Sequence, residues 1–151
     1  MTRLFFWPSV LAIALSQAAC GGDNTMTKHG DNMKIRLRIG NRPLTGTLID
    51  SKTAQDFVSL LPITLTMNDL FGREKFAHLP QAISTEGKRT HTYEVGDIAY
   101  WSPGPDVAIY YQHDGEKIPN PGIIVIGKLD SGVDAFNVPG SAEVKIEVMQ
   151  E

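Results

Sequence analysis

The strongest constraint on the fold is a strict alternation of apolar and charged residues in two segments that lie far apart. Residues 33–39 read MKIRLRI and residues 142–148 read AEVKIEV. A period of two residues is typical of a β-strand with one buried face and one exposed face. The predicted buried faces are formed by Ile35, Leu37 and Ile39 in the first strand and by Val144, Ile146 and Val148 in the second.

Further short strands are predicted between these two. Gly40–Pro43 forms a turn, so that residues 44–50 pair with the first strand as a hairpin. The run IIVIG is wholly apolar, which indicates a strand buried on both faces. The predicted intermediate strands are 44–50, 63–67, 97–101, 107–111 and 123–127.

One helix is predicted directly before Pro62, which ends it. Its apolar stripe follows helical spacing and consists of Ala54, Phe57, Val58 and Leu61. Thr53 is the expected N-cap and Asp56 the expected acidic residue of the first turn. Residues 68–87 are expected to form loops with room for one helical turn. The segment DSGVDAF suggests a second helical turn, with Val133 and Phe136 pointing inward.

Seven or eight short strands with one or two short helices indicate a mainly β fold. A closed antiparallel barrel is the expected architecture, because closure removes unpaired and aggregation-prone edges. We assign this domain to residues 33–151, the size of one ordinary domain.

Residues 1–19 have the features of a secretory signal peptide. Arg3 supplies a positive charge, an apolar stretch follows, and the segment ends with Ala18 and Ala19. The apolar run is too short to span a bilayer, which needs about 20 residues.

Cys20 follows this segment and is the one cysteine of the chain, so an intramolecular disulfide is impossible. The sequence around it resembles a bacterial lipoprotein lipobox, although Gln17 stands where Leu is usual. The resemblance implies lipidation of Cys20, a flexible tether over residues 20–32, and an exported protein anchored to the bacterial envelope on its periplasmic face. In proteobacterial sorting, Gly21 in place of Asp favours the outer membrane. Ordinary export with a free thiol is the alternative.

The charge balance argues against a nucleic-acid partner. The chain has 14 basic and 17 acidic residues, and removal of Arg3 with the signal peptide leaves a net charge of −4. A nucleic-acid-binding domain needs a basic face.

The segment GDIAYWSPGPDVAIYYQHDG is unusual because both faces of its predicted hairpin are apolar or aromatic. One face must fill the barrel, and the other must be covered by the helix around Phe57, by a loop or by a ligand. Aromatic side chains with polar tips are common in small-molecule and peptide sites. The candidate ligand-binding residues are Tyr100, Trp101, Tyr110, Tyr111 and His113, with Glu74 and Lys75 as a possible rim from the irregular segment.

Most of the domain resembles a family of bacterial cyclophilin-like domains. The resemblance rests, in order, on MKIRLRIG, TAQDFVSLLPITLTM, STEG, GDIAYWSPGPDVAIYY and IGKLDSGVDAF. It implies a small barrel of about eight strands with flanking helices, and the family has no assigned activity. True cyclophilins are peptidyl-prolyl isomerases, but their Phe-His-Arg, Gln-Gly-Gly-Asp-like and Phe-Phe segments do not occur here. Isomerase residues therefore cannot be transferred to this chain.

Other chemistries have little support. His29, His78, His91 and His113 are isolated in the sequence, and no His or Cys pair has metal-ligand spacing. No Gly-x-Ser-x-Gly elbow and no nucleotide-binding glycine loop occurs. We therefore expect no metal and no cofactor, and no catalytic residue is identified.

The most economical interpretation is an envelope-anchored domain that binds a small molecule or a peptide. The enzyme alternative is a peptidyl-prolyl isomerase. A third alternative is a protein-interaction module of the cell envelope, with the loop at 112–122 as its contact surface.

Overall fold

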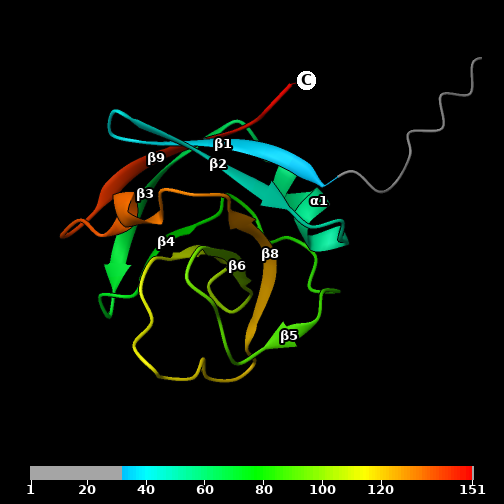
Figure 1. Cartoon of the computed structure of the whole chain (residues 1–151). Helices are drawn as coiled ribbons and strands as arrows, with labels where there is room; N and C mark the ends of the chain where they lie inside the picture. Colours follow the sequence, from blue (N-terminus) through cyan, green and yellow to red (C-terminus); the bar gives the residue numbers. More distant parts are fainter. Residues whose placement is uncertain (1–31, 151) are drawn as a thin grey trace, which may run out of the picture.

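The computed structural model describes residues 32–150 (Figure 1). The predicted signal peptide, Cys20, His29 and the tether up to residue 31 lie outside the described residues. Within residues 32–150, no helix is both long enough and apolar enough to cross a membrane.

In this described part of the chain, nine antiparallel strands form one sheet, and eight of them close into a barrel. The ring runs β2-β1-β9-β3-β4-β7-β6-β8 and returns to β2 through the β2–β8 pairing, while β5 extends the sheet beside β8. The predicted closed barrel of about eight strands is thus confirmed. The strands are β1 (Met33–Ile39), β2 (Arg42–Leu48), β3 (Ile63–Leu70), β4 (Glu74–His78), β5 (Arg89–Thr90), β6 (Asp97–Trp101), β7 (Asp106–Tyr110), β8 (Ile123–Leu129) and β9 (Ala142–Val148).

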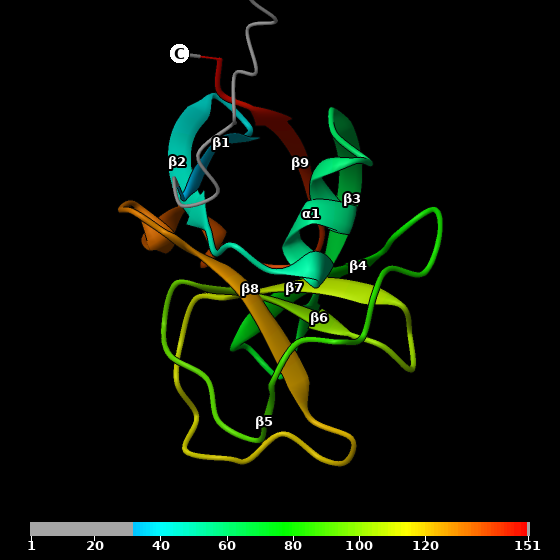
Figure 2. The ribbon, with the colours of Figure 1, turned by 90° about the vertical axis from the view of Figure 1, so that its right-hand side faces the viewer.

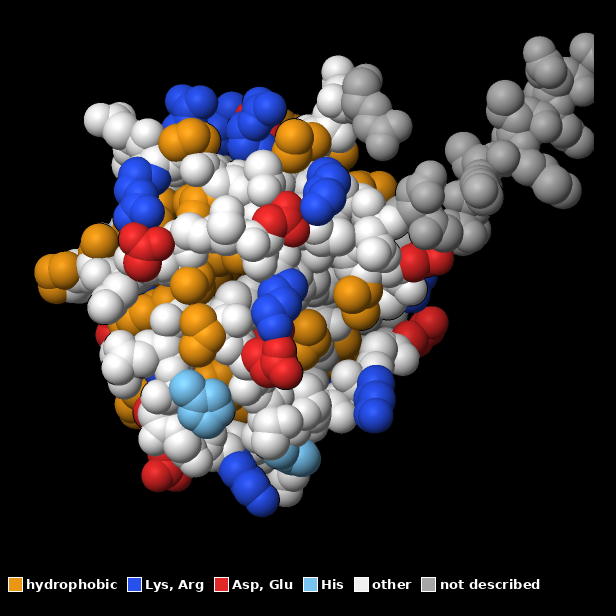
Figure 3. Space-filling model, in the orientation of Figure 1, with side chains coloured by type: hydrophobic (Ala, Val, Ile, Leu, Met, Phe, Trp, Pro, Cys, Tyr) orange, Lys and Arg blue, Asp and Glu red, His pale blue; other side chains and the backbone are white. Residues whose placement is uncertain are grey.

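The alternating segments behave as their sequence predicts. Ile35, Leu37 and Ile39 of β1 and Val144 and Ile146 of β9 are buried in the barrel. Val148 differs from the prediction, because it ends β9 and is 36% exposed. Figure 3 shows Lys and Arg side chains gathered over β1 and β9 on the outer face, as expected for strands with one solvated side.

The predicted helix is α1 (Lys52–Val58), and it lies across the end of the barrel ringed by β2, β1, β9 and β3 (Figure 2). Its N-cap is Ser51 rather than Thr53, since Ser51 Oγ accepts a hydrogen bond from the Ala54 amide at 3.2 Å. Because the helix begins earlier than predicted, Thr53 lies inside it and is fully buried. Asp56 falls outside the first turn and pairs with Lys52 instead.

The second helical turn is a 3-10 helix, η1 (Val133–Phe136), in which Phe136 is fully buried and Val133 packs against the core. The prediction of loops over residues 68–87 is wrong in its first half. β3 continues to Leu70, a tight turn follows, and β4 occupies Glu74–His78. The sequence signal was lost because β4 buries two charged residues, Glu74 and Lys75.

The β6–β7 hairpin has two buried faces, as its sequence predicts. Ile98 pairs with Ile109 and Ala99 pairs with Ala108. The first pair belongs to the main core inside the barrel, and the second belongs to a smaller apolar cluster outside it.

Of the three covers that the sequence left open for this second face, the helix does not provide it and loops do in part. Phe57 of α1 packs inside the barrel, because the helix closes the barrel end. Tyr93 and Ile118, which come from the two loops flanking β6 and β7, pack on the outer cluster instead. These loops cover the outer face of the hairpin only in part, and a pocket lies over the uncovered part.

Candidate ligand-binding pocket

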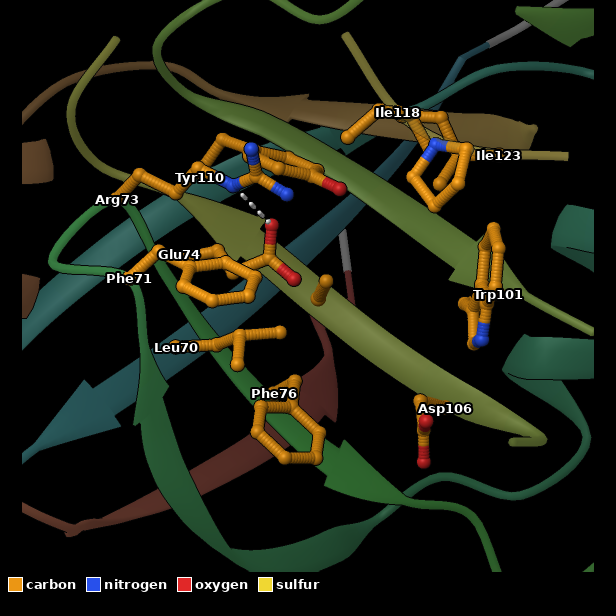
Figure 4. A pocket seen from close by; sticks show the side chains of 12 residues that line it. Leu70, Phe71, Arg73, Glu74, Phe76, Trp101, Asp106, Tyr110, Ile118 and Ile123 are labelled. Atoms are coloured by element: carbon orange, nitrogen blue, oxygen red, sulfur yellow. Dashed lines mark hydrogen bonds and ion pairs between the residues drawn. The ribbon is translucent and has the colours of Figure 1, made fainter. Parts of the chain in front are cut away.

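A pocket of about 200 Å³ lies on the outside of the barrel, over the outer faces of β4, β7 and β6. It is therefore separate from the barrel interior. Its floor is the second apolar face of the hairpin, and its mouth lies at the β3–β4 turn and the loop that precedes β8 (Figure 4). The lining residues are Leu70, Phe71, Arg73, Glu74, Phe76, Trp101, Asp106, Ala108, Tyr110, Ile118, Pro119 and Ile123.

Glu74 brings a buried carboxylate into this apolar surface. Only 6% of the residue is exposed, and its Oε2 accepts a hydrogen bond from Arg73 Nε at 3.1 Å. Burial raises the pKa of Glu74, and the neighbouring Arg73 guanidinium opposes this effect without reversing it. In Figure 4 the carboxyl end of Glu74 faces the middle of the pocket.

Arg73 is shared between two carboxylates. Its Nη1 donates to Asp114 Oδ2 at 3.1 Å, in the loop after β7, and Asp114 Oδ1 accepts from the Tyr93 hydroxyl at 2.7 Å. The guanidinium also lies 5.1 Å from the centre of the Phe71 ring. Through Arg73, Asp114 and Tyr93, these contacts link the β3–β4 turn to both loops that cover the outer face.

Tyr110 forms the floor beside Glu74 and is 1% exposed. Its ring stacks on Tyr93 at 4.2 Å between centroids, and His113 stacks on the other side of Tyr93 at 4.7 Å. Burial, reinforced by the adjacent Glu74 carboxylate, raises the pKa of Tyr110 well above its ordinary value. The tyrosine is therefore neutral at physiological pH. His113 is exposed and lies behind the stack, outside the pocket lining.

Trp101 and Asp106 form the opposite end of the pocket, where they face each other across the β6–β7 turn. Asp106 is 8% exposed, and its Oδ1 lies 2.5 Å from Nδ1 of His78. The His78 side chain is 73% exposed, so the partner of this buried carboxylate is largely in solvent. Burial raises the pKa of Asp106, while His78 acts in the opposite direction.

Three of the sequence-predicted residues lie inside the barrel and away from the pocket. Tyr100 is buried in the core, with its hydroxyl accepting from the Ile83 amide at 3.3 Å. Lys75 is fully buried rather than part of a rim. Tyr111 donates its hydroxyl proton to Asp69 Oδ1 at 2.6 Å, and the same carboxylate oxygen accepts from Lys75 Nζ at 2.9 Å.

The reason for this separation is the strand period. Residues 74 and 76 of β4 point outward and residues 75 and 77 point inward, so adjacent residues cannot share a site. Lys75 is satisfied inside, because its ammonium also donates to the carbonyls of Val138 and Gly140 at 2.5 and 2.6 Å. These bonds hold the loop after η1 against the end of the barrel.

The structure thus brings Trp101, Tyr110 and Glu74 of the predicted set together in one pocket. The sequence reasoning missed Arg73, Phe71, Phe76 and Asp106. Once β4 is recognised as a strand, the alternation of Glu74 and Phe76 would have placed both on the outer face. No sequence signal connects Arg73 with Asp114, because that contact joins residues 41 positions apart.

Comparison with known proteins gives the family. A sequence description of the cyclophilin-like family matches residues 37–147, most of the chain. The chain belongs to the cyclophilin-like family. No curated protein matches it significantly.

A solved structure of the same fold is the solution structure of the hypothetical protein AF2241 from Archaeoglobus fulgidus. The two share 23% sequence identity with a TM-score of 0.65, and the match covers 82% of this chain and all of the archaeal chain. At this identity the likeness shows that the two chains share a fold. The function of the family is unassigned, so the pocket must be interpreted from its own residues.

The pocket is suited to binding an apolar or aromatic group beside a charged one. Among residues 32–150, no group of three or more His, Cys, Asp or Glu side chains is arranged to hold a metal ion. Arg73 is the one arginine of the described lining, and its Nε and Nη1 are already bonded to carboxylates.

Proposed function

We propose that this protein is a binding domain that takes a small molecule, or one side chain of a peptide, in the outer pocket between Phe71 and Trp101. The observation that carries the proposal is the incompletely covered second face of the β6–β7 hairpin. Burying that face would be favourable by itself, yet about 200 Å³ beside Tyr110 and Ala108 is left open.

A second observation supports the same site. Glu74 is only 6% exposed in a mostly apolar lining, and a buried carboxylate is costly unless its environment compensates for it, as Arg73 does in part here. Ionisable groups with perturbed pKa values in a pocket are common at functional sites. The volume suits a group of side-chain size, smaller than the pockets of about 300–1,000 Å³ that enclose a whole drug-sized ligand.

A third observation concerns the mouth of the pocket. Phe71 is 75% exposed and has a φ of 56°, a left-handed backbone conformation that is rare for bulky residues. Strained residues of this kind gather at ligand-binding sites. A large exposed aromatic ring at the pocket mouth offers contact area to a ligand.

Binding can be tested with Trp101 fluorescence in the full chain, with Trp7→Phe leaving Trp101 as the one tryptophan. Capped single amino acids, X-Pro peptides and a panel of small metabolites would be titrated. A saturable change in emission is expected for at least one class. Turnover of an X-Pro peptide would replace the proposal with the isomerase alternative.

A pocket-filling variant provides the control for site specificity. Ala108 lies on the pocket floor, so Ala108→Leu should abolish the fluorescence response. Ala142→Leu adds the same volume on β9, beyond the pocket lining, and should keep it. Equal responses in both variants would place the binding elsewhere and refute the proposal.

We also propose that the domain is exported and held at the bacterial envelope by lipid on Cys20. The support for this part comes from the sequence, namely the signal-peptide pattern of residues 1–19 and the position of the one cysteine. Two or more acyl chains give stable anchoring. The binding pocket would then face the periplasm.

A further inference from the structure

We propose that the group bound in the outer pocket is an organic cation, an alkylammonium or guanidinium head. This inference rests on the proposed binding function and adds the chemical class of the ligand. It does not depend on whether the head belongs to a free amine or to a Lys or Arg side chain of a peptide.

The first argument is the charge balance of the site. Of the twelve residues that line the pocket, Arg73 is cationic, whereas Glu74 and Asp106 are acidic. Arg73 is bonded to Asp114 as well as to Glu74, whereas Asp106, at the opposite end of the pocket, has His78 as its ion-pair partner. Among the described residues, three carboxylates at the site therefore face one permanent cation and one histidine, and an incoming cation would add positive charge.

Other basic side chains do not remove this deficit. Arg89 donates to Ser102 Oγ and to the Gly122 carbonyl, and it does not line the pocket. His78 contacts Asp106 but is largely exposed, and it carries charge only when protonated. Buried carboxylates normally have a charged or hydrogen-bonding partner, so an incomplete set indicates where a ligand would bind.

The second argument is the weak partner of Asp106. The residue lines the pocket and is 8% exposed, and its Oδ1 lies 2.5 Å from His78 Nδ1. The His78 side chain is 73% exposed and carries charge only when protonated, so Asp106 has no Lys or Arg partner among the described residues. An ammonium or guanidinium carries several N–H donors and no acceptor, and it would give this carboxylate a permanent cation.

The third argument is the aromatic wall between the two acidic residues. In Figure 4 the rings of Phe76 and Trp101 flank the space between Glu74 and Asp106, and the Phe71 ring lies beside Glu74. Aromatic faces attract cations within about 6 Å of the ring centre, most strongly for Trp. An anionic head would meet repulsion from both carboxylates, and a neutral apolar head would leave the charge deficit uncorrected.

The inference can be tested with probes that do and do not carry a cationic head. In the Trp7→Phe full chain, Trp101 fluorescence and calorimetry would compare N-acetyl-lysine methylamide with N-acetyl-norleucine methylamide, which keeps the four-carbon side chain and lacks the ammonium. N-acetyl-arginine methylamide and n-butylammonium chloride would be titrated in parallel. The two cationic amino-acid probes should bind at least about tenfold more tightly than norleucine, the usual size of a charge-assisted hydrogen bond. Equal affinity of butylammonium would identify a free amine as sufficient, whereas dependence on the capped backbone would favour a peptide.

Substitution of each pocket carboxylate tests whether it causes the preference for a cationic probe. Asp106→Asn and Glu74→Gln should each reduce the preference for lysine over norleucine, while Glu147→Gln on the outer face of the barrel should not. Asp106→Asn keeps the test valid if Glu74→Gln unfolds the protein by releasing Arg73. Saturable binding of norleucine or proline probes with equal or higher affinity would overturn the cation inference and leave the binding function intact. Absence of binding for every probe, including the wider metabolite panel, would refute both.

Discussion

Arg73 Nε lies 3.1 Å from Glu74 Oε2, and both side chains are more than nine-tenths buried although the residues are adjacent in sequence. Arg73 leaves the turn that precedes β4, whereas Glu74 is the first residue of β4 and points to the outer face. The same guanidinium reaches Asp114 across the pocket edge. One side chain therefore fixes the position of the β3–β4 turn relative to the loop that follows β7.

A substitution of Phe71 in the β3–β4 turn should weaken ligand binding without lowering the stability of the fold. The Arg73 amide donates to the Leu70 carbonyl at 3.2 Å across Phe71 and Gly72, whose φ values are 56° and 64°. Asn-Gly suits two consecutive positive φ values far better than Phe-Gly. Phe71→Asn should relieve about 1 kcal/mol of strain and lose about 0.5 kcal/mol of cation–π contact with Arg73.

We therefore expect Phe71→Asn to be equal to or slightly more stable than the wild type in urea unfolding, and to bind pocket ligands more weakly. Phe71→Leu keeps an apolar side chain in the strained position and should be less stable than Phe71→Asn. Loss of stability in Phe71→Asn would show that the ring is structural.

Lys75 should be essential for stability rather than for binding. Its ammonium is fully buried and makes three bonds, to Asp69 and to two loop carbonyls. Lys75→Met removes all three donors and leaves a carboxylate without its cation, which should cost about 3–5 kcal/mol. Lys145→Met removes an exposed lysine and should change stability by less than about 1 kcal/mol. Equal effects of the two substitutions in urea unfolding would contradict this account.

Asp69 should give the protein part of its acid sensitivity. The hydrogen bond from Tyr111, followed by that from Lys75, lowers the pKa of Asp69 below its ordinary value of about 3.9. Because the unfolded state binds this proton more readily, the stabilising contribution is present above about pH 4 and is lost as pH falls toward the folded pKa.

The free energy of unfolding, measured from pH 7 down to pH 2, should therefore fall less steeply below pH 4 in Asp69→Asn than in the wild type. Tyr111→Phe removes the first cause of the shift and should give an intermediate slope. If the free energy of unfolding fell equally steeply below pH 4 in all three proteins, Asp69 would not contribute to the acid sensitivity.

The lipid-anchor proposal predicts a simple labelling result. In a bacterial host, radiolabelled palmitate should be incorporated into the wild-type chain and not into Cys20→Ser, and the wild type should fractionate with membranes. Mutation of a residue in the described domain, such as Ser102→Ala, should leave labelling unchanged. Label that persists in Cys20→Ser would refute the proposal.

Glu74 and Lys75, which are adjacent in β4, illustrate what the sequence could and could not reveal. The alternation in β1 and β9, and the two apolar faces of the β6–β7 hairpin, were readable from the chain because strand period is a local property. The same logic failed at β4, where Glu74 and Lys75 are both charged and both buried. Their partners come from the turn at Arg73, from Asp69 and from the loop at 138–140, and no local pattern encodes those contacts.

The sequence by itself therefore determined most of the strands, the closed barrel and the presence of surplus aromatic surface on one hairpin. The tertiary structure decided which aromatics serve the core and which line a pocket, since Tyr100 and Tyr111 face inward while Trp101 and Tyr110 face outward. It also decided that the helix closes the barrel end and that loops only partly cover the outer face. The physical reason is that a residue's spacing fixes its face of a strand, whereas the packing of distant segments fixes what covers that face.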